Sequence, residues 1–378
     1  MSANTSKSIY IVSPWPGSIK ESMGFLSISK SATILANYFK RLELRKTVVC
    51  SVNHFPVEMA SDKTTGPRLA YLFRPADLLI HGDKIEKITH VQLLIHQQDI
   101  IEGHLQRAVP ALKGKVVVPL LYEHKELFSK FGIAYEDSVL PIPIEQLPPD
   151  LNLRTLKGIL VSSRRPSIVL MSNHSVRKNF YEGFLAVLDA VKLYNSDVVL
   201  HVVSHTGGTS SIRRVLDYYP VSGLNVHFHD NPSQKDLYTI VGQSTTLVLP
   251  AFDEGYNLVT REMSRLGIDI VCADIPVNSS FKREGRISLF AVSKQEMVGN
   301  DKDEISQVTE FEVPVYSDMV QKIAASLFKW EDTKNHMLSR MESHATVGHV
   351  IPGFVEALSR VYKAPIRKDT SETIIYVI

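Results

Sequence analysis

The sequence predicts an α/β protein of two doubly wound domains, each a parallel sheet with helices on both faces. Three observations support this fold class. The chain has 378 residues, which is more than one hydrophobic core usually serves. Short β-branched runs alternate along it with longer segments of helical periodicity. The alternation stops in a proline-rich stretch, residues 140–153, and restarts after residue 160.

The first half opens with "SIYIVS" (8–13), a β-branched run that predicts a strand. Residues 29–44 follow, and their apolar side chains fall on one face of a helix. Further strands are expected at residues 47–52, 91–96 and 115–122.

The second half repeats the pattern with a strand at "SIVLMS" (167–172) and a helix at "FYEGFLAVLDAVKLY" (180–194). Apolar runs that predict four more strands follow at residues 197–204, 225–230, 245–252 and 269–274.

The proline-rich stretch 140–153 lacks strand alternation and is typical of an interdomain connector. We therefore expect an N-terminal domain over residues 1–150 and a C-terminal domain over residues 151–345. Residues 346–378 are expected to form a helix that packs back toward the N-terminal domain, followed by a β-prone tail.

Composition excludes several classes of protein. The net charge is only +2, which gives no indication of a nucleic-acid partner. Cys50 and Cys272 both lie in apolar runs, so a disulfide framework is not expected and a reducing compartment is. The first residues contain no apolar core of signal-peptide length, so we expect no signal peptide. No apolar run reaches the ~18 residues of a membrane-spanning helix. We expect a cytoplasmic protein, with any membrane contact peripheral at the inner face.

In doubly wound sheets, ligands gather beyond the carboxyl ends of the strands. The most informative such place is the stretch 245–267, where an apolar run leads into "DEGYN" and then into a helix that Gly267 can end. Glu254 and Glu262 lie on either side of this turn. The free N–H groups of a helix that begins near Asn257 are suited to binding an anion.

Two other interpretations of these glutamates stay open from the residues alone. Carboxylates are common near a helix start because they favour the positive end of its dipole. A glycosidase pair needs carboxyls about 5 to 9.5 Å apart, and on one continuous helix the two would lie about 12 Å apart along the axis. The spacing therefore does not favour a glycosidase.

The stretch "LVLPAFDEGYNLVTREMSRLGIDIVCADIP" resembles the signature region of retaining GT-B glycosyltransferases of family 4. The two glutamates have the same spacing of seven intervening residues, and Gly267 and Asp274 fit the pattern. Ala251, where the family has serine, departs from it, as do Asn257 for glycine and Asp269 for proline. Asn tolerates turn conformations, so the loop can persist.

The resemblance implies two Rossmann-like domains that face a central cleft, with the donor bound in the second. It implies that the first glutamate lies by the donor sugar, that the second binds the nucleotide ribose, and that the loop amides hold the diphosphate. These roles are carried to Glu254, to Glu262, and to Gly255, Tyr256, Asn257, Leu258 and Val259.

Other parts of the chain contribute through the same resemblance. Lys178 and Arg177 match the cations that neutralise the donor diphosphate, and Asn173 stands where the family often has an arginine. His229 and Asp230 correspond to the segment beside the nucleobase. His124 follows a first-half strand, where the family often has a histidine near the donor sugar.

No metal and no other cofactor is expected. Enzymes that the resemblance points to usually work without a bound metal. Four histidines suggest zinc, but no cysteine or carboxylate completes their set; they are His201, His205, His227 and His229.

The sequence thus predicts a retaining, metal-independent hexosyltransferase. It would move a hexose, with a mannose-type GDP-sugar preferred, to a glycan or lipid-linked acceptor in bacterial surface polysaccharide synthesis. The alternatives are a non-catalytic GT-B subunit that scaffolds a partner glycosyltransferase and, third, an epimerase that acts on a UDP-sugar.

Overall fold

The computed structural model describes residues 8–13, 46–51, 68–86, 88–96, 99–100, 103–137, 139, 151–204, 208–279, 286–298 and 308–344. These residues divide into two compact units, one up to residue 139 and one from residue 151. Four features expected from the sequence lie outside the described residues: the helix at 29–44, most of the connector 140–153, His205 and the segment 346–378.

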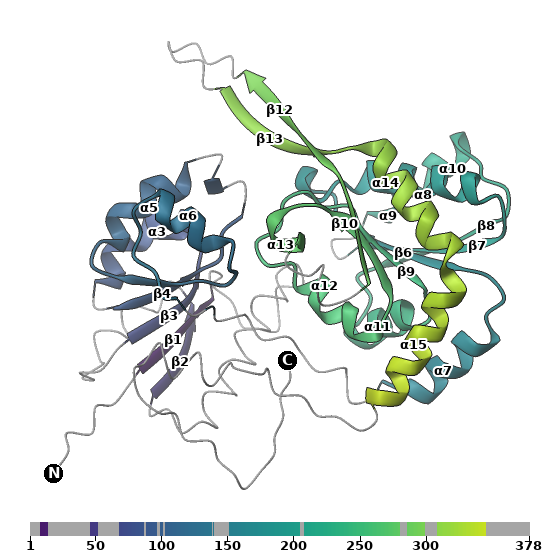
Figure 1. Ribbon diagram of the computed structural model, residues 1–378, viewed down its shortest axis with the longest axis horizontal. Coiled ribbons are helices and arrows are strands. Elements are labelled where there is room, and N and C mark those ends of the chain that lie inside the picture. The colour runs from purple at the N-terminus through teal and green to yellow at the C-terminus, as the bar shows by residue number, and fades with distance from the viewer. Residues whose placement is uncertain are drawn as a thin grey trace, which may run out of the picture. The chain divides into compact units, whose positions relative to one another are not determined.

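The N-terminal unit is built on a five-stranded parallel sheet in the order β2-β1-β3-β4-β5 (Figure 1). Its strands are β1 (Ser8–Ser13), β2 (Lys46–Ser51), β3 (Arg68–Phe73), β4 (His90–Leu93) and β5 (Val116–Val118). Its helices are α3 (Pro75–His81), the 3-10 helix η1 (Gly82–Ile85), α5 (His104–Leu112) and α6 (His124–Lys130).

Buried side chains from these helices pack on β4 and β5, with Leu78, Leu105 and Phe128 almost fully covered. Lys115, just before β5, is also buried, and its ammonium donates to the carbonyls of Ile85 at 2.7 Å and Ile88 at 3.0 Å. Because these carbonyls replace water around the charge, the lysine can serve as a structural link.

The C-terminal unit has a six-stranded sheet in the order β11-β10-β9-β6-β7-β8, with every neighbouring pair parallel. Its strands are β6 (Ser167–Ser172), β7 (Val198–Ser204), β8 (Leu224–Asp230), β9 (Thr246–Leu249), β10 (Asp269–Ala273) and β11 (Ile287–Phe290). Every residue of β6 and β9 is buried, as expected of central strands of a sheet covered on both faces.

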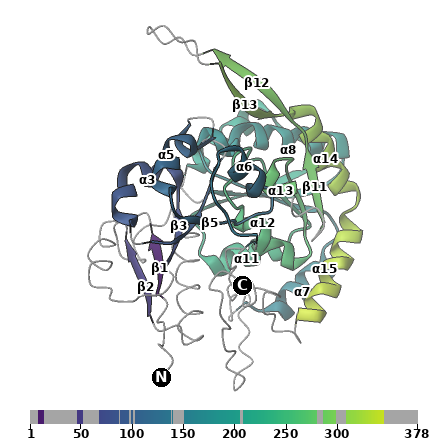
Figure 2. The same ribbon diagram turned by 60° about the vertical axis from the view of Figure 1, so that its left-hand side comes forward.

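Helices join these strands and cover both faces of the sheet (Figures 1 and 2). The α-helices are α7 (Leu153–Ser162), α8 (Phe180–Tyr194), α9 (Thr209–Arg213), α10 (Val215–Tyr218), α11 (Gln234–Gly242), α12 (Leu258–Met263), α13 (Pro276–Ser279), α14 (Tyr316–Phe328) and α15 (Trp330–His344). The 3-10 helices are η2 (Val176–Lys178) and η3 (Ser264–Leu266).

Local sequence explains several helix starts. Asn152 before α7 accepts a hydrogen bond from the Thr155 amide at 2.9 Å, and Ser233 before α11 accepts one from the Asp236 amide at 3.2 Å. Both are the short polar residues that cap free N–H groups well.

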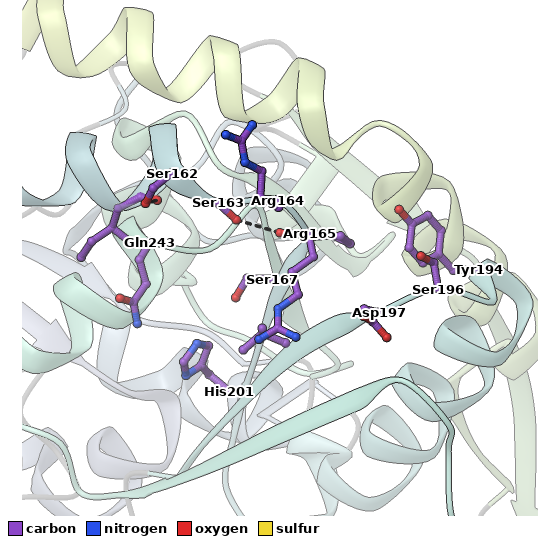
Figure 3. Close-up of a pocket in the computed structure, with 13 residues that line it drawn as sticks. Ser162, Ser163, Arg164, Arg165, Ser167, Tyr194, Ser196, Asp197, His201 and Gln243 are labelled. Carbon is purple, nitrogen blue, oxygen red and sulfur yellow. Dashed lines mark hydrogen bonds between the residues drawn. The ribbon is translucent and has the colours of Figure 1, made fainter.

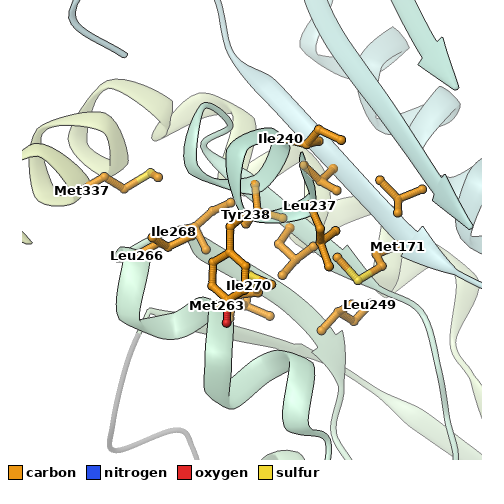
Figure 4. Packing of buried hydrophobic residues seen from close by; sticks show 14 of the residues in the cluster. Met171, Leu237, Tyr238, Ile240, Leu249, Met263, Leu266, Ile268, Ile270 and Met337 are labelled. Carbon is orange, nitrogen blue, oxygen red and sulfur yellow. The ribbon is translucent and has the colours of Figure 1, made fainter. Parts of the chain in front are cut away.

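One face of the six-stranded sheet carries a large apolar core, which Figure 4 shows from close by. Leu237 and Tyr238 of α11 meet Met263 of α12 there, over Ile270 of β10 and Met171 of β6. Met337 of α15 joins the same cluster, so α15 is part of the C-terminal unit's core.

Three features of the fold go beyond the strands expected from the sequence, and one of them is β11, which pairs with β10. Strand β3 lies between β1 and β4 and was not predicted. Strands β12 (Val292–Val298) and β13 (Val308–Pro314) form an antiparallel ribbon that extends from the C-terminal unit (Figures 1 and 2). Among the described residues, no helix is both long and apolar enough to cross a membrane.

Candidate functional site

The candidate site lies where the strand order of the C-terminal sheet reverses. The first strand of this unit, β6, has the second strand β7 on one side and the fourth strand β9 on the other. The loops after β6 and β9 therefore leave the sheet side by side and continue in opposite directions. Such a switch point, outside the carboxyl ends of the strands, is where open α/β sheets bind ligands.

The loop after β6 is held by its own short polar side chains. The Ser172 hydroxyl donates to the Lys178 carbonyl at 2.6 Å. The Asn173 side-chain oxygen accepts from the amide of Ser175 at 3.0 Å and from its hydroxyl at 2.8 Å. Asn179 then adopts a left-handed conformation, with φ of 50°, just before α8. These contacts turn the chain sharply, so that η2 presents two consecutive basic residues beside β9.

Those basic residues contact the loop that follows β9. The Phe252 amide donates to the Arg177 carbonyl at 3.1 Å, and the Arg177 guanidinium donates to the Asp253 carbonyl at 3.3 Å. The Lys178 ammonium makes an ion pair with the Glu254 carboxylate. Both side chains of this pair are 18% exposed. Three residues assigned from the sequence, Arg177, Lys178 and Glu254, therefore lie together.

The turn after Glu254 is fixed by Asn257, which caps α12. Its φ is 46°, in the left-handed region, where Asn is the best-tolerated residue after glycine. Its side-chain oxygen accepts from the Thr260 amide at 3.2 Å, and its amide nitrogen donates to the buried Asn278 at 2.7 Å. Asn278 in turn donates to the Ala273 carbonyl at 2.9 Å, which connects the turn to β10. A glycine could adopt the same backbone but could not make these contacts.

The loop also buries its aromatic residue. Tyr256 is 3% exposed, and the Arg261 guanidinium lies 4.1 Å from the centre of its ring. Leu258 is buried and Val259 packs at the edge of the core. The helix expected from Leu258 to the stop at Gly267 is an α-helix only to Met263. It tightens into η3 before Gly267, whose φ is 76°.

Glu262 lies on α12 in an electrostatic cluster with the Tyr238 hydroxyl and Arg265. Burial, together with the negative charge of Glu262, raises the pKa of Tyr238. Burial lowers the pKa of Arg265, which the nearby Glu262 counteracts. The Glu262 carboxylate on α12 thus interacts electrostatically with both Tyr238 and Arg265.

At the end of β8, His229 and Asp230 already have protein partners. The Asp230 carboxylate accepts from the Thr209 amide at 3.2 Å and from its hydroxyl at 2.9 Å, which caps α9. His229 shares a hydrogen bond of 3.0 Å with His201 on β7, and His227 stacks on His201. Burial, reinforced by the neighbouring histidines, lowers the pKa of His201 to about 4.

His124 lies in the N-terminal unit, at the first turn of α6 after β5. It is 9% exposed and stands edge-on to Phe128, with ring centres 6.0 Å apart. Its Nδ1 is buried and has no hydrogen-bond partner among the described residues. Burial lowers its pKa to about 4, so the imidazole is neutral at physiological pH.

Three residues of this site were not singled out from the sequence: Asp253, Asn278 and Tyr238. Asp253 was quoted only as a turn residue, yet its carbonyl receives Arg177. Asn278 and Tyr238 have no signal in the motif, because they contact it only through the tertiary fold. In the stretches that the structure describes, no three His, Cys, Asp or Glu side chains gather in a way that could hold a metal ion.

No protein-family model matches the sequence, and no curated protein matches it either. Solved structures share its fold at low identity. Anabaena HepE in complex with UDP and glucose is 11% identical, with a TM-score of 0.58 over 95% of this chain and 99% of that one. A structure described as trehalose-6-phosphate from E. coli bound with UDP-2-fluoro glucose is 12% identical, with a TM-score of 0.55 over 94% and 99%.

Sucrose-phosphate synthase from Thermosynechococcus elongatus is 11% identical, with a TM-score of 0.53 over 90% of this chain and 100% of that one. At these identities the likeness concerns the fold. The fold class predicted from the sequence is confirmed: the chain has the GT-B fold, with two Rossmann-like α/β units.

Proposed function

We propose that this protein is a retaining, metal-independent glycosyltransferase that moves a hexose from a nucleotide diphosphate sugar to a glycan or lipid-linked acceptor. One observation carries the proposal. Lys178 and Arg177 after β6 meet Glu254 after β9 at the switch point of a Rossmann sheet. Two cations and a carboxylate at that position suit a ligand with a diphosphate and a sugar.

Lys178 and Arg177 would stabilise the diphosphate as it leaves. Charge develops on the leaving group when the sugar–oxygen bond breaks, and fixed cations in a partly buried site stabilise it strongly. The amides of residues 255–259, at the start of α12, would bind the same group. In the free protein Glu254 holds Lys178, so the ammonium needs little rearrangement when the diphosphate arrives.

The two glutamates would hold the parts of the donor on either side of the diphosphate. Glu254 lies in the loop and would accept hydrogen bonds from sugar hydroxyls. Glu262, inside α12, would accept them from the ribose. His229 and Asp230 at the end of β8 would line the nucleobase side of the donor site, and Asn173 after β6 would lie on its diphosphate side.

The N-terminal unit would bind the acceptor, and His124 would act near the transferred sugar. The proposed setting is bacterial surface polysaccharide synthesis. There the protein would make peripheral contact with the membrane or with a partner glycosyltransferase. A mannose-type GDP-sugar is the donor preferred from the sequence. UDP-sugars belong in the same test, because two of the solved structures of this fold hold UDP or a UDP-sugar derivative.

A thermal-shift panel of GDP- and UDP-sugars tests the proposal. One donor at about 100 times its dissociation constant should stabilise the protein by about 2.7 kcal/mol. The same donor should give no shift with Glu262→Ala. An exposed substitution away from the site, Lys329→Met, should leave the shift unchanged.

The outcomes separate the candidate functions. If no donor shifts the wild-type protein, a non-catalytic GT-B subunit that scaffolds a partner becomes the better description. A donor that binds and is epimerised without any acceptor would indicate an epimerase. When transfer is observed, NMR of the product's anomeric proton decides whether configuration is retained.

A further inference from the structure

A cavity of about 640 Å³ lies at the amino ends of β6 and β7 in the C-terminal unit (Figure 3). Its floor includes Ser167, the first residue of β6, and His201 of β7, and its wall includes Gln243 after α11. The proposed donor residues lie at or beyond the carboxyl ends of β6, β8 and β9. The cavity therefore lies at the other end of the sheet, and the hydrogen bond between His201 and His229 is the contact that connects its lining to a proposed donor residue.

The charge in this cavity is mainly positive. Arg164 and Arg165, from the loop between α7 and β6, both line it. Within the described part of the chain, neither guanidinium has a hydrogen bond or an ion pair. Asp197 is the one acidic residue among those that line the cavity. The arginines are thus available for a ligand, and an anion would compensate their charge.

The position of Arg165 is fixed by its backbone. The Ser163 hydroxyl donates to the Arg165 carbonyl at 2.8 Å, which Figure 3 marks with a dashed line. From there the Arg165 side chain points toward the part of the cavity where Ser167 and His201 lie, whereas Arg164 points to the other side. The hydrogen bond holds the backbone at Arg165, and the guanidinium is oriented toward the polar floor of the cavity.

The floor is polar and preorganised. The Ser167 hydroxyl is buried and lies 3.0 Å from the Ser244 hydroxyl. The His201 ring is 8% exposed, and its Nδ1 is engaged with His229 at 3.0 Å. The described residues provide no partner for its Nε2. The cavity therefore offers a buried imidazole edge on the side toward which the unpaired Arg165 guanidinium points.

We propose that this cavity is a second ligand site, which binds a small molecule through a phosphate group. The planar fork of arginine matches the oxygens of phosphate, and such pairs are among the stronger hydrogen bonds in proteins. The volume falls within the range of ~300–1,000 Å³ that small-molecule sites occupy. Gln243 and His201 supply further polar contacts for the remainder of the molecule.

Calorimetric titration of the full-length protein with inorganic phosphate tests this site. Sodium chloride keeps the ionic strength constant, so that general screening does not contribute. We expect saturable binding by the wild-type protein. Arg165→Gln should weaken the affinity at least tenfold, and Arg165→Lys, which keeps the charge and loses the fork, should weaken it less.

Two control variants make the assignment specific. Arg154→Gln removes an exposed arginine of α7 that does not line the cavity, and it should leave the affinity within twofold. Lys178→Met removes a cation of the proposed donor site and should also leave it within twofold. Arg165 is exposed, so its variants should fold, which their unchanged melting temperature without phosphate would verify.

Absence of saturable binding by the wild-type protein would overturn the proposal. So would a loss of affinity in Lys178→Met that Arg165→Gln does not share, because phosphate would then occupy the donor site. The proposal does not depend on the glycosyltransferase assignment. If no donor binds in the thermal-shift panel, the phosphate titration still tests whether the cavity binds phosphate.

Discussion

The ion pair of Lys178 and Glu254 ties the loop after β6 to the loop after β9 and has two separable effects. Lys178→Met should lower donor affinity at least tenfold, which is about 1.4 kcal/mol. It should also lower the free energy of unfolding by about 1 kcal/mol, because the carboxylate that remains is only partly solvated.

Exchange of the two charges separates these effects. Lys178→Glu combined with Glu254→Lys can restore an ion pair, so stability should recover while donor affinity should not. Urea unfolding measures the first and titration with the donor measures the second. Full recovery of donor affinity would contradict the proposed contact between Lys178 and the diphosphate.

Protonation of His201 should make the C-terminal unit less stable in mild acid. Its pKa is about 4 in the folded protein and about 6.5 in an unfolded chain. The unfolded state therefore binds more protons between these values, and stability falls as pH falls through that window. The loss from pH 7 to pH 5 should be on the order of 2 kcal/mol.

The hydrogen bond between His201 and His229 also predicts lower stability at lower pH, because two protonated imidazoles have no acceptor nitrogen left for it. Urea unfolding at pH 5, 6 and 7 measures the dependence. His201→Gln, which keeps a polar group at the position, should have a smaller dependence than the wild type. An equal dependence in both proteins would assign the effect to other groups.

At the scale of elements, the site depends on how closely α8 approaches the turn after β9. Gly183 of α8 faces Pro250, and a Cβ at this glycine would lie 2.6 Å from the proline ring. Gly183→Ala should therefore lower the free energy of unfolding by about 1–3 kcal/mol, although alanine is the better helix former. Donor affinity should also fall, because Pro250 is four residues before Glu254.

Gly158 of α7 provides the matched control. It is an exposed helical glycine, and a Cβ there would have nothing within 4 Å. Gly158→Ala should stabilise the protein by about 0.5–1 kcal/mol and leave donor affinity unchanged. Urea unfolding of both variants distinguishes a helix effect from a packing effect, and stabilisation by Gly183→Ala would show that α8 can move away from the turn.

At the scale of the whole molecule, nucleotide binding and transfer should depend on different units. The proposed nucleotide contacts all lie in the C-terminal unit, whereas His124 belongs to the N-terminal one. His124→Asn should leave nucleotide affinity within twofold and lower the transfer rate at least tenfold, which is about 1.4 kcal/mol of the activation free energy.

Tyr122, two residues earlier and 71% exposed, supplies the control, since Tyr122→Ala should change neither quantity. Titration with the nucleotide and the rate of sugar transfer are the two measurements. Loss of nucleotide affinity in His124→Asn, with the fold intact by circular dichroism, would count against this division of roles.

Local pattern accounts for much of this fold. The strand at 8–13 and the strand and helix at 167–172 and 180–194 have the predicted bounds. For 167–172 the reason is that burial on both faces of the sheet leaves an unbroken apolar run. The ribbon of β12 and β13 was not predicted, since charged and polar residues interrupt the apolar residues of both strands. Strand β3 was missed because "RLAYLF" contains no β-branched residue.

The sequence by itself determined the α/β class, the restart of the pattern in the second half, and the glutamate and lysine residues of the candidate site. Only the tertiary structure decided that β6 lies beside β9, which brings Lys178 to Glu254 across 76 positions of the chain. It also decided that Asn278 supports the turn at Asn257 and that Arg165 shares a cavity with His201. The reason is physical: periodicity reports which face of a segment is buried, whereas strand order results from long-range packing of the whole sheet.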